Sequence, residues 1–140
     1  MRASSDTERA LFELVDAYNH AYEIAAVEHD MSVAQACVLG RISRPRGMRE
    51  LADELRCDAS NITQIVSRLE ARGLVERHQH PEDRRSRQLT RTTAGDALNA
   101  AFEQSFEFAR AATAKLSVAE QRTLSVLLDK ALGRAGTDEA

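Results

Sequence analysis

The chain is poor in the residues that mark secreted, membrane and disulfide-rich proteins. None of its 140 residues is tryptophan, aromatic residues make up 4%, and only two residues are cysteine. The cysteines lie far apart and form no CxxC pair, which argues against a disulfide framework and favours a reduced, cytoplasmic compartment. No apolar run is long enough to span a bilayer, and we expect no signal peptide. We therefore predict a cytoplasmic protein with no membrane partner.

The patterns of catalytic and metal sites are also missing. The chain has no glycine-rich phosphate loop and no Ser-His-Asp or Cys-His arrangement on plausible loops. His78 and His80 form an H-x-H pair, and His20 and His29 lie further apart, but neither pair has a convincing metal-site spacing. We predict no metal, no cofactor and no enzymatic activity.

What the sequence does contain is helical periodicity. Hydrophobic residues make up 43% of the chain, mostly Leu, Ala, Val and Ile. Apolar residues recur at helical spacing from Thr7 to His29, and Ser32 with Gln35 forms a capping box that opens a second helix. A single helix is expected from about Thr93 to Ala112. Ser117 with Glu120 opens a last helix. The predicted fold class is mainly α with a small β component (α+β).

The segment from Met48 to Gly95 is the most informative. It predicts a short helix over Met48–Leu55, a four-residue turn, and a helix that ends before Gly73. Strands are expected at residues 74–78 and 87–92, joined by an arginine-rich loop. A helix-turn-helix followed by such a hairpin, or wing, can place one helix in the major groove of duplex DNA.

The charge distribution agrees with a DNA-facing module. The net charge is -3, but residues 41–92 carry twelve Arg against eight Asp and Glu, an excess of +4. The rest of the chain carries seven positive and fourteen negative residues, a balance of -7. An uneven but otherwise ordinary solvated surface is the alternative explanation of this excess.

The second helix of the pair is predicted to present a polar face. Ile62 and Ile65 point into the core at helical spacing, which leaves short polar groups and one arginine turned outward. These residue types contact phosphates and base edges. The outward residues are Ser60, Asn61, Thr63, Gln64, Ser67 and Arg68.

This order of elements resembles the MarR family of winged helix-turn-helix transcriptional regulators. The similarity spans nearly the whole chain. Its specific parts are ELA at Glu50–Ala52, SNIT and VSRLEARGLVER within Ser60–Arg77, and D-x-R-x-x-x-L-x-x-T-x-A-G at Asp83–Gly95. The resemblance implies that Asp83 braces the wing and that Arg85 enters the minor groove. Arg84 and Arg87 are expected to contact phosphates.

The resemblance also implies a partner and a trigger. A single domain, residues 1–140, would contain a DNA-binding lobe at 33–92 and dimerisation helices at 1–31 and 93–140. The homodimer would bind a pseudo-palindromic operator, most often as a repressor. A small aromatic or anionic effector would release it. Tyr18, Tyr22, His29 and Arg41 are the candidate pocket residues, although a place in the dimer interface is the preferred interpretation of the tyrosines.

Other hypotheses remain open at this point. The winged helix could serve as a protein-interaction module without a specific operator. Cys37 or Cys57 could sense oxidants, but their apolar surroundings favour inert thiols. Three positions depart from the family pattern. Arg56, often glycine there, predicts an ordinary helical or bridging backbone, and Cys57 takes the place of a small apolar core residue in the turn. Arg91, usually leucine, predicts a stem that covers apolar surface with its charged head in water.

Overall fold

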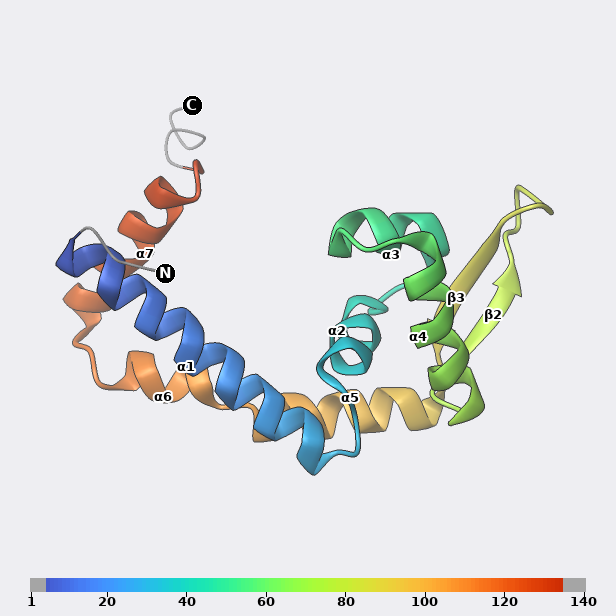
Figure 1. The fold of residues 1–140 in the computed structure, drawn as a ribbon, viewed down its shortest axis with the longest axis horizontal. Coiled ribbons are helices and arrows are strands. Elements are labelled where there is room, and N and C mark those ends of the chain that lie inside the picture. The colour runs from blue at the N-terminus through green and yellow to red at the C-terminus, as the bar shows by residue number, and fades with distance from the viewer. Residues whose placement is uncertain (1–4, 135–140) are drawn as a thin grey trace. The chain divides into compact units, whose positions relative to one another are not determined.

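The computed structural model describes residues 5–134, which form two compact units that divide after Phe106. The first contains α1 (Asp6–Glu28), α2 (Val33–Arg41), β1 (Arg46–Gly47), α3 (Met48–Leu55), α4 (Ala59–Ala71), β2 (Val75–Gln79), β3 (Arg87–Arg91) and α5 (Thr93–Ser105). The second contains α6 (Phe108–Ala114) and α7 (Val118–Ala131) (Figure 1). The predicted fold class, mainly helical with a small antiparallel sheet, is confirmed. The ends of the predicted dimerisation segments, residues 1–4 and 135–140, lie outside the described residues.

Local capping explains where several helices begin. The Ser32 hydroxyl accepts a hydrogen bond from Gln35 N at 3.1 Å, and the Gln35 side-chain oxygen accepts one from Ser32 N at 3.3 Å. In the second unit, Ser117 and Glu120 make the same pair of bonds at 3.1 and 2.9 Å. Both predicted capping boxes are therefore confirmed, each satisfying two backbone N–H groups that the first turn leaves unpaired.

The core of the first unit joins α2, α3, α4 and the sheet. Its largest fully buried side chains are Leu39, Ile42, Leu51, Ile62, Leu69, Leu89, Val38 and Val66. The sheet has the order β1-β3-β2, with antiparallel pairing that places both Arg46 and Arg77 opposite Leu89. The two predicted wing strands are confirmed to within one residue. Strand β1 was not predicted, because two residues carry no periodicity.

The predicted helix from Thr93 to Ala112 is wrong as a single element. It breaks between Ser105 and Phe108. The Ser105 hydroxyl donates to the Phe102 carbonyl at 3.0 Å, and side chains that bond to nearby backbone compete with helix continuation. The Phe106 ring also packs edge-on against Tyr18 and Tyr22, each at 5.2 Å between ring centroids. The break therefore lets Phe106 join an aromatic cluster with α1.

Both predictions at the unusual arginines are also wrong. Arg56 has φ 53° and ψ 43°, the left-handed conformation, because the Cys57 N–H closes the end of α3 by bonding back to the Ala52 carbonyl at 2.9 Å. The Arg91 side chain is only 15% exposed. Its guanidinium bonds to Asp96 at 2.8 Å and to the Leu39 carbonyl at 3.3 Å instead of lying in water.

Candidate nucleic-acid interface

Helix α4 separates the side chains of the core from a polar outer face. Ile62, Ile65 and Leu69 are buried, because residues three and four apart share one face of a helix. The outer face carries the predicted DNA-contacting residues, and all six are exposed: Ser60, Asn61, Thr63, Gln64, Ser67 and Arg68. Within residues 5–134, the side chains of Asn61, Gln64 and Arg68 make no hydrogen bond or ion pair, so they are free to contact a partner.

Two residues of this face already have internal partners. The Thr63 hydroxyl donates to the Ala59 carbonyl at 2.8 Å. The Ser67 hydroxyl accepts from the Arg77 guanidinium at 3.4 Å, while Arg77 also pairs with Glu70 at 2.7 Å. Each hydroxyl oxygen retains acceptor capacity, but its orientation is restrained. Asn61, Gln64 and Arg68 are thus the better suited residues for reading bases.

The wing loop is organised around Asp83. Its carboxylate oxygen Oδ1 accepts a hydrogen bond from Arg85 N at 3.0 Å, and its carbonyl accepts one from Ser86 N at 3.1 Å. His80 N donates to the Ser86 carbonyl at 3.0 Å, which closes the loop. The side chain of an aspartate that bonds to backbone two residues on stabilises a turn. The Asp83 carboxylate therefore contacts the backbone N–H of Arg85 and not its guanidinium group. Among the ion pairs of the described residues, no Asp83–Arg85 pair occurs.

The predicted arginines of the wing are exposed. The guanidinium groups of Arg84, Arg85 and Arg87 have no ion pair or hydrogen bond with any of residues 5–134. The three exposed arginines outnumber the two exposed carboxylates of the loop, Glu82 and Asp83, and a positive surface of this kind attracts a polyanion.

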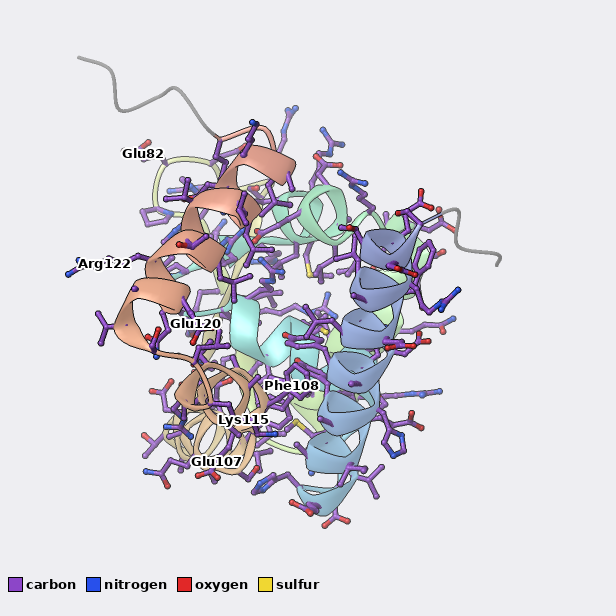
Figure 2. The ribbon with its side chains drawn as sticks, turned by 90° about the vertical axis from the view of Figure 1, so that its left-hand side faces the viewer. Glu82, Glu107, Phe108, Lys115, Glu120 and Arg122 are labelled. Carbon is purple, nitrogen blue, oxygen red and sulfur yellow. The ribbon has the colours of Figure 1, made fainter. Side chains whose placement is uncertain are left out.

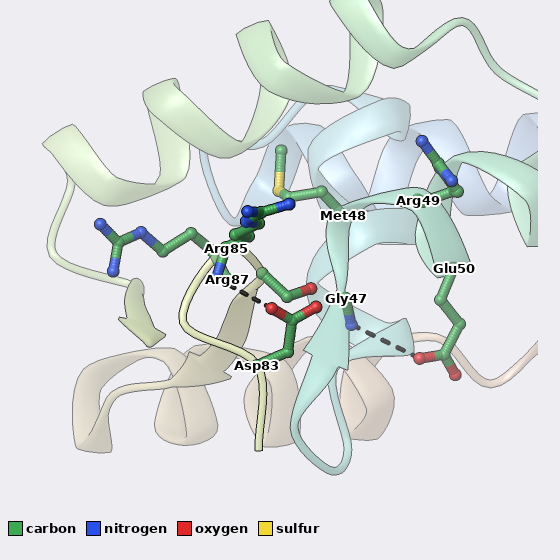
Figure 3. Close-up of a pocket in the computed structure, with 8 residues that line it drawn as sticks. Gly47, Met48, Arg49, Glu50, Asp83, Arg85 and Arg87 are labelled. Carbon is green, nitrogen blue, oxygen red and sulfur yellow. Dashed lines mark hydrogen bonds between the residues drawn. The ribbon is translucent and has the colours of Figure 1, made fainter. Parts of the chain in front are cut away.

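A groove lies between the wing and the beginning of α3 (Figure 3). Its volume is about 550 Å³. The lining residues are Gly47, Met48, Arg49, Glu50, Asp83, Arg85, Ser86 and Arg87. The sequence interpretation missed Arg49, which faces outward on α3 while Leu51 and Ala52 are buried. Helical periodicity could have placed Arg49 on the surface, but only the tertiary structure brings it opposite the wing.

A network of arginines and glutamates joins α2, β1 and α3. Arg46 is only 8% exposed; its guanidinium donates to Glu50 at 2.7 Å and to the Arg41 carbonyl at 2.9 Å, and it also pairs with Glu54. Arg41 pairs with Glu54 and Arg44 pairs with Glu50, both at 2.8 Å. The Arg44 hydrogen bond, the Gly47 N–H and the charge of Arg46 hold the pKa of Glu50 below its ordinary value against some desolvation. The network therefore braces the beginning of α3.

The four candidate effector residues do not converge as one set of ligands. Tyr18 and Tyr22 belong to the aromatic cluster, with Tyr22 at 5.0 Å from Phe102 between ring centroids. His29 shares a 3.0 Å hydrogen bond with the Ser105 hydroxyl, whereas the Arg41 guanidinium pairs with Glu54. Burial and a hydrogen bond with Cys37 raise the pKa of Tyr22, against the nearby charge of Arg41.

Cysteines and metal-ligating side chains are the remaining candidate features of the described residues. Cys37 and Cys57 are free and half-buried. Residues 5–134 contain no group of three or more His, Cys, Asp or Glu side chains placed to hold a metal ion. Among the helices of that same region, none combines the length and apolar character needed to cross a membrane.

Comparison with known proteins decides the family. The model of the MarR family matches residues 39–86, the segment that holds the helix-turn-helix and the wing loop. The solved structure of wild-type MarR from E. coli in its apo form is 26% identical, covers 94% of this chain and 99% of its own, and superposes with a TM-score of 0.76. Residues 39–86 are therefore identified as a helix-turn-helix and wing of the MarR family.

Two further solved structures resemble this one. The structure of a MarR mutant from E. coli complexed with operator DNA is 27% identical, covers 89% of this chain and 91% of its own, and has a TM-score of 0.71. A probable transcriptional regulator from Pseudomonas aeruginosa is 27% identical, covers 92% and 98%, and has a TM-score of 0.70. No curated protein matches the chain. MarR-family proteins are transcriptional regulators rather than enzymes.

Proposed function

We propose that this MarR-family protein binds a pseudo-palindromic operator as a homodimer and represses transcription from it. The observation that carries the proposal is the pairing of two exposed surfaces: the polar face of α4 and the three unpaired arginines of the wing. Helix α4 would enter the major groove, where Asn61 and Gln64 can bind adenine and Arg68 can bind guanine or a phosphate. Ser60, Thr63 and Ser67 would add contacts to bases or phosphates.

The wing would extend the contact along the duplex. Arg85, whose backbone is held by Asp83, would enter the adjacent minor groove, where narrow A·T-rich segments concentrate negative potential. Arg84 and Arg87 would bind phosphates. The similarity to MarR solved with operator DNA supports this placement.

Apolar surface supports the homodimer. On α1, the side chains of Leu11, Leu14, Val15 and Tyr18 are between 41% and 51% exposed, at helical spacing along one stripe. In the second unit, α7 exposes Val118, Val126 and Leu127, each by more than half, and Leu132 directly after it is exposed to the same degree. Apolar stripes of this kind mark protein interfaces. We assign residues 1–31 and 93–140 to dimerisation and 33–92 to DNA binding, and half-sites would lie about one helical turn, roughly 10 bp, apart.

Release by a small aromatic or anionic effector is the regulatory part of the proposal. The half-buried Tyr22, near the charge of Arg41, is the best candidate contact. A regulator of this kind would act in the cytoplasm, together with the DNA.

The test is fluorescence anisotropy on the DNA upstream of the protein's own gene, with a scrambled duplex alongside and a series of salt concentrations. We expect a preference of about a hundredfold or more for the operator and saturation at two chains per site. Arg85→Ala should weaken binding to both duplexes, whereas Asn61→Ala and Gln64→Ala should relax base preference at defined positions.

Equal and weak binding to both duplexes, with no preferred site in a genome-wide pull-down, would overturn the proposal. It would favour a winged helix that serves protein contact. A reporter gene placed behind the operator tests repression directly, since loss of the protein should raise its expression.

A further inference from the structure

The groove between α3 and the wing contains an arginine, Arg49, that the function proposed above does not use. We propose that this groove holds a phosphate group of the DNA backbone, bound by Arg49 from α3 together with Arg87 from the wing, while Arg85 continues into the minor groove. The proposal rests on the proposed DNA-binding function and adds a ligand, Arg49, that lies outside both the recognition face and the wing. Figure 3 shows the three arginines around the same hollow.

The lining has uncompensated positive charge. Within residues 5–134, the guanidinium groups of Arg49, Arg85 and Arg87 have no hydrogen bond or ion pair. The two carboxylates of the lining are already engaged. Glu50 accepts from Arg44 at 2.8 Å, from Arg46 at 2.7 Å and from the Gly47 N–H at 3.4 Å.

Asp83 accepts from Arg85 N at 3.0 Å. This neutral N–H leaves the charge of the Asp83 carboxylate in place, but the three arginines without ion pairs still exceed this one carboxylate. Guanidinium groups bind phosphate oxygens through charge-assisted and often bidentate hydrogen bonds.

The geometry of the duplex explains why a phosphate should lie there. A sugar-phosphate chain separates each major groove from the neighbouring minor groove. If α4 occupies the major groove and the wing loop the minor groove, the strand between them must pass between the helix-turn-helix and the wing. The groove of about 550 Å³ occupies that position. The Gly47 N–H already donates to the Glu50 carboxylate at 3.4 Å, so the proposed ligands are the arginine side chains.

Arg49→Gln is the test variant, and Arg122→Gln is its matched control. Both arginines are exposed on helices and have no hydrogen bond or ion pair within the described residues. Figure 2 shows Arg122 extending away from α7. Circular dichroism and the unfolding temperature should be unchanged in both variants, since neither side chain has an internal partner to lose.

The first measurement is affinity against salt concentration, on the upstream duplex and on its scrambled version. One lost phosphate contact should weaken binding to both duplexes by about threefold to tenfold and reduce the slope of log K against log salt by about 0.9. Arg122→Gln, compared once sedimentation has shown that it has the same oligomeric state as the wild type, should retain the wild-type affinity and slope. An unchanged slope in Arg49→Gln would overturn the inference.

The second measurement locates the phosphate. Duplexes that carry one neutral methylphosphonate linkage each are compared in wild type, Arg49→Gln and Arg122→Gln. At one position per half-site, the neutral linkage should weaken the wild type and Arg122→Gln but cost Arg49→Gln nothing further, as expected for one shared contact. Equal losses in all three proteins at every position would overturn the inference.

The two proposals can fail separately. If the wild type prefers its operator but Arg49→Gln behaves like the wild type, only the groove assignment fails. If the wild type shows no preference but Arg49→Gln still lowers the salt slope, the groove binds phosphate and the proposal of a specific operator fails.

A free anion is the other possible source of a phosphate in the groove. If the wild type binds inorganic phosphate in calorimetry and Arg49→Gln does not, while both proteins bind the duplexes with equal affinity and equal salt slope, the groove is a small-anion site and the assignment to DNA is overturned.

Discussion

The Arg72 guanidinium, just after α4, donates a 2.7 Å hydrogen bond to the backbone carbonyl of Asp30 in the turn between α1 and α2. A second bond, at 3.3 Å, reaches Gln35, the residue that caps the beginning of α2. Asp30 has a positive φ of 55°, so its carbonyl has an orientation that few residues adopt. Arg72 thereby connects the end of the proposed recognition helix to the turn that follows α1, the helix proposed to form the dimer.

Substitution of Arg72 should loosen the spacing between the two recognition helices. Inserting one base pair between the half-sites should weaken binding of the wild type by about tenfold or more, because the distance between its two recognition helices is fixed. The same insertion should weaken binding of Arg72→Ala by roughly threefold or less. Arg72→Lys can still donate to the Asp30 carbonyl and should behave more like the wild type. Identical spacing profiles in all three proteins would show that this bond does not set the spacing.

Acid should remove the contribution of Glu50 to stability. The Arg44 hydrogen bond, followed by the Gly47 N–H and the charge of Arg46, lowers the pKa of this carboxyl in the folded chain. A lowered pKa stabilises the fold above the unfolded value of about 4.3, and that contribution is lost as pH falls through the folded value. Glu50→Gln should therefore unfold at a lower temperature than wild type at neutral pH, with the difference shrinking below about pH 4.

The matched control for this measurement is Asp53→Asn. Asp53 is an exposed carboxylate on the same helix and has no ion pair within the described residues. Thermal unfolding of the three proteins across the acid range is compared. A gap between wild type and Glu50→Gln that stays constant with pH would contradict the expectation.

Gly95→Ala should be among the most damaging small substitutions in the chain. A Cβ at this position would collide with the backbone carbonyl of Leu74 and would lie 3.3 Å from the Arg91 Cβ. Moving the Leu74 backbone to relieve this clash would disturb the surrounding packing, so we expect a loss of about 2–4 kcal/mol in the free energy of unfolding. Denaturant unfolding gives the value directly.

Gly40→Ala is the control, because a Cβ there would lie at an ordinary 3.6 Å from the Asn99 side chain. In the interior of α2 it should be neutral or stabilise the protein by up to about 1 kcal/mol. Equal effects of the two substitutions would mean that the close approach of α5 to Leu74 is not what requires glycine.

Arg56→Gly should stabilise the protein. The left-handed backbone at φ 53° is unfavourable for a residue with a Cβ, and glycine removes that strain at some cost in unfolded-chain entropy. The net gain should be about 0.5–1 kcal/mol. Arg56→Ala keeps the Cβ and should show no such gain. Both variants should bind DNA like the wild type if the effect is confined to the backbone, which the anisotropy assay checks.

The sequence by itself determined most of the local structure. The capping boxes at Ser32 and Ser117, the end of α4 before Gly73 and the buried stripe of Ile62 and Ile65 were all predictable. Each depends on residues within about four positions of one another, where helix geometry alone decides which groups meet. The polar face of α4 and the wing motif followed from the same periodicity and from the family resemblance.

The remaining features arise from contacts between residues distant in sequence, and only the tertiary structure decided them. The pairing of β1 with β3 required the wing to fold back on Arg46. The break after Ser105 accompanies the packing of Phe106 against α1. The groove joins Arg49 to Arg85 and Arg87 across two separate elements. Composition and periodicity predict which side chains lie on the outer face of each helix or strand. A binding groove depends on which helices and strands face one another, and packing of the whole core decides that.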